Sequence, residues 1–316
     1  MPLKRILAYA AIYLLWGGSY LAIHFIVQTV PPVFAASIRY GVSGLLLLLL
    51  SYLAGHRTRP TPRQVFNSFL TGAGMFALGY AGVYWAETRL PSWLVSVLTS
   101  TALFWTYAIE CLVLRAYRLR WIVLMPILLG LVCMPLLVGA TLRNGRSYSL
   151  LAVFIVLFGA ISWAVFAAVM KRVEMPSSYL QTASLQMLIS GLLLFVISCS
   201  LHEWYAVPSI THIGSKALLG FAYLVFGSSL IGFTAFHWLM VHDQTLLIAT
   251  YTYINPIVAT LLGILLGHEL YSPQQMLATF VLLLSIGCVW NEVGRNPSRL
   301  RSPVGSAAGS EYRIPR

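Results

Sequence analysis

The sequence predicts an all-α integral membrane protein of ten transmembrane helices, arranged as two inverted five-helix repeats with both termini in the cytoplasm. Three observations lead to this prediction: an apolar composition, ten long apolar runs, and a sequence phrase that occurs twice. Of the 316 residues, 59% are hydrophobic and only 9% are charged. A water-soluble domain carries about 25% charged residues. This chain therefore lacks the polar side chains needed to cover a hydrated surface.

The apolar runs set the number of expected spans. A helix needs about 20 apolar residues to cross the hydrocarbon core. Ten such runs follow one another with short connections, at about 6–26, 32–54, 66–86, 92–114, 121–140, 150–170, 179–201, 217–240, 245–266 and 273–291. The remaining residues, 292–316, are rich in Arg, Ser, Pro and Gly, and we expect a disordered basic tail.

The distribution of positive charge orients these runs. With a cytoplasmic N-terminus, 15 of the 20 lysines and arginines fall on the cytoplasmic side and four on the other, while Arg39 lies inside a span. Cytoplasmic loops of membrane proteins carry such an excess. An odd number of spans would place the five arginines of the tail outside. The bias thus supports ten spans with both ends in the cytoplasm.

The basic net charge of +12 also raises nucleic acid as a partner. Here the bases form short clusters between apolar runs, as in membrane loops, so we expect the lipid bilayer and a small-molecule substrate as partners and no nucleic acid. No residues have metal-ligand spacing, and we expect no metal and no cofactor. The four cysteines fit small buried hydrophobes better than a disulfide framework: Cys111, Cys133, Cys199 and Cys288.

An internal repeat decides the architecture. The phrase "AASIRYGVSGLLL" returns 147 positions later as "TASLQMLISGLLL", and Trp16 matches Trp163 at the same offset. Further along, the offset becomes 153, which relates Trp85 to Trp238. Each copy holds five expected spans. Because five is odd, the second copy enters the membrane inverted, an architecture common among secondary transporters.

These segments resemble the EamA-type members of the drug/metabolite transporter superfamily. The resemblance covers nearly all of residues 5–291 and rests on several motifs taken together: "YLLWGGSYLAIHF", "PPVFAASIRYGVSGLLL", "YWAETRLPSWLVSVL", "ISWAVFAAVMKR", "VFGSSLIGFTAFHWL", "TYTYINPIVATLLGILLGHEL" and "PQQMLATFVLLLSIG". It implies ten helices in two inverted repeats, here 5–141 and 149–291. It also implies export of small metabolites across the bacterial inner membrane, with the cargo left open.

Two positions depart from the family pattern. This chain has Trp93 where a glycine is usual, and Leu103 where a proline is usual. The second repeat keeps its proline, Pro256. We therefore expect the fourth span to be straighter than the ninth.

Arg39 is the charge that lies inside the first copy of the repeated phrase, where the second copy has Gln186. It stands about eight residues into its span, roughly 10 Å deep. A charge at such depth costs a few kcal/mol and should face a cavity or a partner. Arg39 can bind an anionic group of the cargo, or it can be a structural tie to helix-end carbonyls or to Glu87. The family pattern, which keeps a base here for many cargoes, favours the structural role.

The motif "TYTYINP" marks a second candidate site. Pro256 leaves the carbonyl of Thr252 without its helical partner, beside Asn255 at membrane depth. Such a kink can serve packing alone, but within this repeat we interpret Thr252, Tyr253 and Asn255 as substrate-binding residues.

Aromatic residues in mid-span form the third candidate. Trp16 and Trp163 lie near the centres of their spans, whereas interfacial tryptophans belong at span ends. We predict that they line the central cavity, with Tyr13, Tyr20, Tyr80 and Tyr84 as neighbours; ordinary aromatic packing is the alternative. Gln186 is a further candidate substrate-binding residue.

Ionisable residues within or beside the spans are candidates for proton coupling: His24, Glu87 and His237. Glu87 can instead form a simple ion pair near the outer edge. The histidines titrate near neutral pH, but a neutral, hydrogen-bonded histidine is the commoner state.

Two functions follow from these observations. The first is a secondary transporter that exports small amphipathic metabolites, such as amino acids or related compounds, by alternating access. The alternative is a membrane-embedded enzyme that acts on lipid or a lipid-linked substrate. With eight acids and no metal-spaced acidic pair, the sequence favours the transporter. The coupling ion and the choice between monomer and homodimer stay open.

Overall fold

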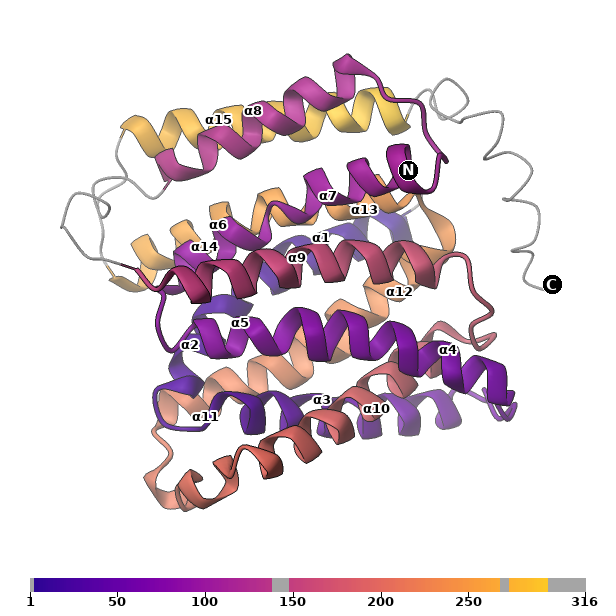
Figure 1. The fold of residues 1–316 in the computed structure, drawn as a ribbon, viewed down its shortest axis with the longest axis vertical. Coiled ribbons are helices and arrows are strands. Elements are labelled where there is room, and N and C mark those ends of the chain that lie inside the picture. Colours follow the sequence, from indigo (N-terminus) through magenta and orange to yellow (C-terminus); the bar gives the residue numbers. More distant parts are fainter. Residues whose placement is uncertain (1–2, 138–147, 268–272, 295–316) are drawn as a thin grey trace.

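Helices alone make up the regular structure of this computed structural model, which describes residues 3–137, 148–267 and 273–294 (Figure 1). Within those ranges, eight stretches are long and apolar enough to cross a membrane. Two of the expected spans are not among them: the helical stretch 62–86, and residues 121–133, which form a shorter apolar helix. The described part of the chain is therefore a multi-pass helical membrane protein.

The first repeat comprises the helical elements up to residue 137. They are α1 (Leu3–Gly17), α2 (Ser19–Val27), α3 (Pro32–Leu53), α4 (Pro62–Gly72), the π-helix η1 (Ala73–Tyr80), α5 (Ala81–Ala86), α6 (Ser92–Thr99), α7 (Ala102–Ala108), the π-helix η2 (Ile109–Val113) and α8 (Trp121–Leu137). Residues that favour helix N-termini mark the start of several of these helices. Proline occupies the first helical position of α3 and α4, and Thr61 and Gln64 form a capping box at α4.

The second repeat follows the same order. Its elements are α9 (Leu150–Met170), α10 (Tyr179–Ser200), the short 3₁₀ turns η4 (Glu203–Ala206) and η5 (Ile210–His212), α11 (Ser215–Ala222), the π-helix η6 (Tyr223–Phe233), α12 (Thr234–His242), α13 (Thr245–Ala249), α14 (Tyr251–Gly267), α15 (Pro273–Val289) and the π-helix η7 (Trp290–Gly294). The helix thus continues to Gly294, three residues into the expected tail; residues 295–316 lie outside the described residues.

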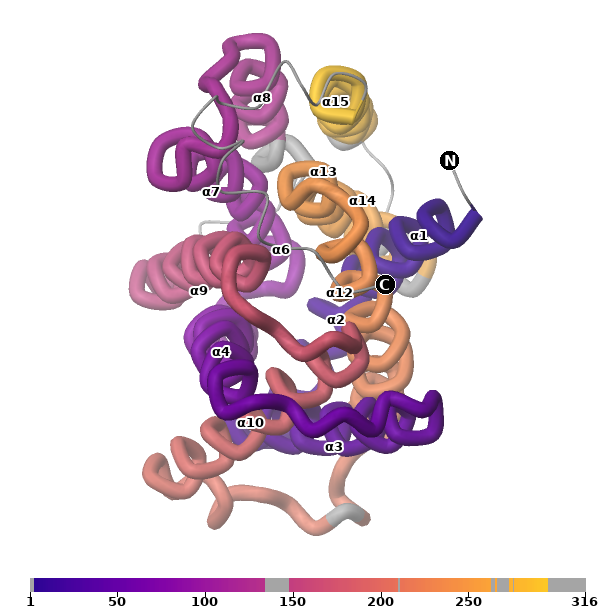
Figure 2. Tube along the Cα trace, turned by 90° about the vertical axis from the view of Figure 1, so that its right-hand side faces the viewer, coloured from indigo at the N-terminus to yellow at the C-terminus, as the bar shows by residue number. Residues whose placement is uncertain are grey.

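The two copies of the repeated phrase lie against each other. They form α3 and α10, which are side by side along one edge of the bundle in both views (Figures 1 and 2). A Cβ at Gly191 would lie 2.5 Å from the backbone nitrogen of Gly41, and one at Gly44 would lie 2.7 Å from that of Leu188. Gly44 and Gly191 are related by the repeat. The matched glycines let the two helices approach closely.

Helices α8 and α15 lie side by side at the opposite edge (Figures 1 and 2). The Ser285 hydroxyl donates to the Pro126 carbonyl at 2.7 Å between them. Pro126 sits within α8.

Large apolar side chains cover the outside of the bundle. Among the most exposed are Leu45, Phe154 and Leu192, each at least 60% exposed. Such a surface is stable against lipid but not against water. It is consistent with a bundle that lies within the bilayer.

The fourth span, which we expected to be straighter than the ninth, is also interrupted. The helix breaks between α6 and α7, at Ser100 and Thr101, although no proline is present. The Thr99 and Thr101 hydroxyls donate to carbonyls three residues back, at 2.9 and 2.8 Å, and the Ser100 hydroxyl does the same to Val97. Such back-bonding bends helices. The ninth span has a matching break between α13 and α14, at Thr250.

Candidate functional site

Aromatic side chains fill the centre of the bundle where the two repeats meet. Trp16 and Trp163, which the repeat relates, contact each other edge to face with ring centroids 5.9 Å apart. Phe233 and Phe236 lie against both indoles, and Tyr251 packs on Trp16 at 4.6 Å. The indole nitrogen of Trp16 donates to a backbone carbonyl of η6. This cluster forms an apolar wall between the two repeats.

Arg39 lies beside that wall and is 1% exposed. Its guanidinium donates to the Ser228 hydroxyl at 2.8 Å, to the Ser229 hydroxyl at 3.1 Å and to the Tyr84 hydroxyl at 3.3 Å. It also lies 5.1 Å from the ring centre of Tyr40. The two serines come from η6 of the second repeat and Tyr84 from α5 of the first. Arg39 therefore joins both repeats.

No acid pairs with Arg39 in the described residues. The ion pairs found there involve other residues, and Glu87, the expected structural partner, pairs with His24 instead. Three hydroxyls are bonded to the guanidinium, which has five N–H groups. A buried cation held only by neutral hydroxyls keeps its positive charge available to an anion.

Gln186 occupies the matching position in the second repeat and is fully buried. Its amide oxygen contacts Nε2 of His237 at 2.6 Å, and its amide nitrogen donates to the Thr71 hydroxyl at 2.7 Å. The imidazole is itself buried, and its Nδ1 lies 2.8 Å from the Phe233 carbonyl. Gln186 thus belongs to a network with His237 rather than to the group around Arg39.

The residues of "TYTYINP" fall into two groups. The Thr252 hydroxyl donates to the Ala249 carbonyl at 2.9 Å, and the Tyr253 hydroxyl donates to the Ile127 carbonyl at 2.5 Å, so these two hold the break in place. Asn255 is 1% exposed, and neither atom of its amide has a hydrogen-bond partner in the described part of the chain. An unpaired buried amide has free capacity to bind a ligand.

Tyr20 lies near Asn255. Its hydroxyl shares a 2.7 Å hydrogen bond with the Thr99 hydroxyl, at the break of the fourth span. Tyr20 is 2% exposed. Tyr20 therefore lies between Asn255 of the ninth span and the break of the fourth span.

His24 and Glu87 form the remaining expected pair. Their closest atoms, Nδ1 and Oε2, are 3.4 Å apart. The Glu87 side chain is completely buried, whereas that of His24 is 33% exposed. The pair lies at the end of the bundle opposite to the N-terminus, where α2 and α5 end.

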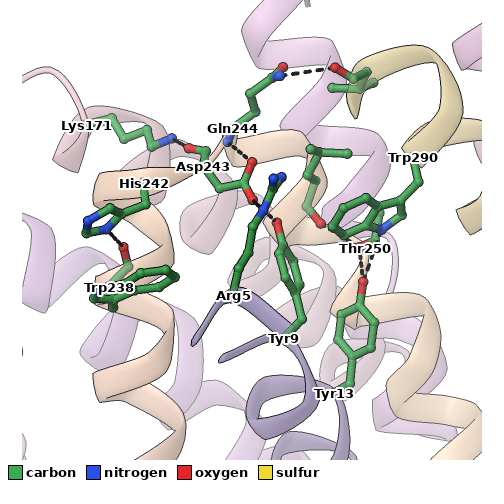
Figure 3. Close-up of polar contacts among 12 residues, drawn as sticks. Arg5, Tyr9, Tyr13, Lys171, Trp238, His242, Asp243, Gln244, Thr250 and Trp290 are labelled. Atoms are coloured by element: carbon green, nitrogen blue, oxygen red, sulfur yellow. Dashed lines mark hydrogen bonds and ion pairs between the residues drawn. The ribbon is translucent and has the colours of Figure 1, made fainter. Parts of the chain in front are cut away.

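A polar network lies at the end of the bundle that carries the N-terminus (Figure 3). The Asp243 carboxylate, between α12 and α13, accepts from the Arg5 guanidinium at 2.6 Å and from the Tyr9 hydroxyl at 2.9 Å. Lys171, just after α9, donates to the Asp243 carbonyl. Since Arg5 and Tyr9 belong to α1, Asp243 ties the first helix of one repeat to the second repeat.

The same end holds further contacts. Tyr13 shares a 2.7 Å hydrogen bond with Thr250, and the Trp290 indole donates to Tyr13 at 3.3 Å (Figure 3). Two more ion pairs connect the repeats there: Arg172 with Glu110 at 2.9 Å, and Arg120 with Glu292 at 3.2 Å.

The structure brings together only part of the predicted set. Around Arg39 it assembles Tyr84 and, through Ser228, Trp16, while Gln186 and His237 form a separate network. Ser228, Ser229 and Asp243 were not predicted from the sequence. The two serines had one signal, the "GSSL" pair inside an apolar run, and the isolated Asp243 at a span end had none beyond its charge.

Transmembrane helices, two repeats and buried polar groups at their junction are typical of a multi-pass membrane transporter. The chain belongs to the EamA-like transporter family, which matches residues 3–138 and 150–291.

Relatives agree with this class. Over 279 residues, covering 87% of both chains, the sequence is 29% identical to the uncharacterized inner membrane transporter YedA of Escherichia coli K12. It is 21% identical over 260 residues to an uncharacterized transporter of Buchnera aphidicola, covering 82% of this chain and 85% of the other. One crystal structure shares the fold, with a TM-score of 0.71 at 19% identity, over 92% of this chain and 98% of the other. The protein is a multi-pass transporter of the inner membrane.

Proposed function

We propose that this protein exports small amphipathic carboxylates, such as amino acids, by alternating access, and that Arg39 binds the cargo carboxylate. The observation that carries the proposal is a fully buried guanidinium whose described partners are all neutral. A carboxylate meets such a group with charge-assisted hydrogen bonds. The aromatic wall around Trp16 and Trp163 suits an apolar side chain on the same cargo.

The proposed topology has ten spans, with repeats at 5–141 and 149–291 and both termini in the cytoplasm. The excess of basic residues at the end that carries Leu3 supports this orientation. Inverted repeats give two similar halves that can exchange shapes and expose a shared site to either side. The contacts around Asp243 would then close the cytoplasmic side.

Asn255 and Tyr20 complete the proposed cargo site. The unpaired amide of Asn255 can both donate and accept, as the amino group and carboxylate of an amino acid require. We place Thr252 and Tyr253 next to the site as residues that hold its shape. Gln186 and His237 stand apart from it.

A flux experiment tests the proposal. Purified protein in liposomes is loaded with unlabelled leucine or phenylalanine, and uptake of the radiolabelled amino acid by counterflow is measured. The matching amines, isopentylamine and phenethylamine, lack the carboxylate and should not exchange. Arg39→Gln should abolish exchange, and Arg63→Gln, an exposed arginine in a surface ion pair, should not.

Two results would contradict the proposal. Exchange of the amines at the rate of the amino acids would remove the carboxylate requirement. Chemical conversion of lipid or amino acid without net flux would point to the membrane enzyme instead.

A further inference from the structure

The repeat relates two pairs of contacting residues. The offset of 147 carries Arg39 onto Gln186, and the offset of 153 carries Tyr84 onto His237. In the structure Arg39 contacts Tyr84, and Gln186 contacts His237. Equivalent positions therefore hold a fixed cation with a phenol in one repeat and an amide with an imidazole in the other.

The two sites lie at matching depths from opposite ends of the bundle. Arg39 is the eighth residue of α3 and Gln186 is the eighth residue of α10. At 1.5 Å per residue each lies roughly 10 Å from the start of its helix. Since the repeats are inverted, the Gln186 site lies nearer the end of the bundle that carries the N-terminus, although Gln186 belongs to the second repeat.

Both ring nitrogens of His237 face oxygen atoms. Nδ1 faces the Phe233 carbonyl and Nε2 faces the amide oxygen of Gln186. The direction of the amide depends on the Thr71 hydroxyl at its other side. While that hydroxyl donates to the Asn67 carbonyl at 2.7 Å, it accepts from the Gln186 amide nitrogen.

In this orientation of the amide, the two ring nitrogens of His237 face a carbonyl and an amide oxygen, which only accept, so the arrangement is complete when both nitrogens carry a proton. When the imidazole loses its proton from Nε2, the amide of Gln186 has to turn and donate to that nitrogen. The Thr71 hydroxyl then turns from Asn67 to the amide oxygen. These two complete hydrogen-bond arrangements differ by one proton.

Among the described residues, no charged side chain is paired with His237. Helix α10 and the elements η6 and α13 contain no charged residue. The other groups on neighbouring elements are engaged elsewhere, in pairs or on carbonyls: Arg5 of α1 with Asp243, Arg63 of α4 with Glu174, Arg172 beyond α9 with Glu110, and His242 of α12 with the Trp238 carbonyl. Lys4 lies in the first turn of α1 and Lys171 after the end of α9.

We propose that His237, with Gln186 and Thr71, is the proton-binding site that couples transport to the proton gradient. The inference rests on the proposed function above. The imidazole is 2% exposed, so its proton exchanges with water only when the N-terminal end opens. Protonation and closure of that end are then linked, and a pH difference across the membrane biases which end is open.

Simultaneous measurement of cargo and protons tests the site. Liposomes containing the full chain and an internal pH-sensitive dye receive leucine, and both leucine flux and proton movement are recorded. The wild type should move about one proton per leucine, as expected for a single titrating site. In His237→Gln the proton movement per leucine should fall to zero. His242→Gln changes a histidine on the same helix whose ring lies against Trp238 and its carbonyl, and it should retain the wild-type ratio.

Gln186→Glu provides a second, opposite perturbation. A carboxylate at this position holds the imidazole permanently protonated. Leucine exchange should then lose the pH dependence that the wild type shows. Proton movement should be lost as well. This variant decides the question if His237→Gln does not fold.

The outcomes separate the two proposals. Wild-type leucine exchange without proton movement overturns this inference and leaves the proposed function standing. Proton movement that survives in His237→Gln, or that is lost only in Glu87→Gln, overturns it in favour of another group. Loss of leucine exchange in both His237→Gln and Gln186→Glu would also overturn it. Absence of wild-type exchange of either amino acid refutes the proposed function itself.

Discussion

Removing the charge of Asp243 should open the N-terminal end of the bundle. Arg5 and Tyr9 both donate to the same carboxylate oxygen, Oδ2, while Oδ1 accepts from the Gln244 backbone N–H. The Asp243→Asn side chain keeps one oxygen acceptor, so it loses the ionic contact with Arg5 and cannot accept from both sides. A hydrogen bond to a charged group contributes about 1.5–3 kcal/mol. The Arg5 side chain is 28% exposed, so solvent screening reduces this to about 1–2 kcal/mol.

That free energy shifts the balance between closed and open forms. Since about 1.4 kcal/mol corresponds to a tenfold change, the open population should rise roughly 5- to 30-fold. The increase can be measured with Ala167→Cys in a background without the native cysteines. Ala167 lines a small cavity between the repeats, together with Trp163 and Phe236, and is 4% exposed. A membrane-impermeant maleimide added from the N-terminal side should label it faster by the same factor.

Glu174→Gln is the matched control for this prediction. It removes another ion pair at the same end of the bundle, Arg63 with Glu174 at 3.9 Å, whose side chains are 77% and 48% exposed. Labelling should then stay within about twofold of the wild type, because exposed pairs contribute little. An unchanged or slower rate in Asp243→Asn would refute the reasoning that this network closes the bundle.

Three further changes have definite expected outcomes. Arg39→Met should abolish amino-acid exchange while leaving the melting temperature in detergent equal or higher, because a buried unpaired charge destabilises the fold; a large drop in melting temperature would make Arg39 a structural tie. Gly191→Ala places a Cβ against the Gly41 backbone and should cost about 1–3 kcal/mol by thermal unfolding. Gly41→Ala meets no atom within 4 Å and should be tolerated; equal costs would refute the close crossing. Tyr253→Phe removes the bond to the Ile127 carbonyl and should lower the unfolding free energy by about 1 kcal/mol; no change would show that this bond is not formed.

The sequence predicted the class of fold because membrane insertion depends on quantities that run along the chain. Run length and apolar content decide whether a segment leaves water, and both can be counted from the residues. The repeat also related Trp16 to Trp163, which we expected to line a central cavity; in the structure the two indoles pack against each other. The EamA-like family also matches the chain in two segments, residues 3–138 and 150–291.

Helix breaks were predicted less well. Pro256 correctly drew attention to the ninth span, but the break of the fourth span at Ser100 depends on hydroxyls that bond backward to carbonyls. The π-helical segments η1 and η6, at matching places in the repeats, had no recognised signal. Small residues permit such distortions without requiring them, so packing decides where they occur.

By itself, the sequence determined that this protein is a helical membrane protein with two related halves and an arginine buried among apolar residues. Only the tertiary structure decided the partners of that arginine, Ser228 and Ser229, and the separate network of Gln186 and His237. The reason is physical. Transfer into lipid is a property of each segment alone, whereas a hydrogen bond between residues 190 positions apart depends on how helices cross and rotate against each other.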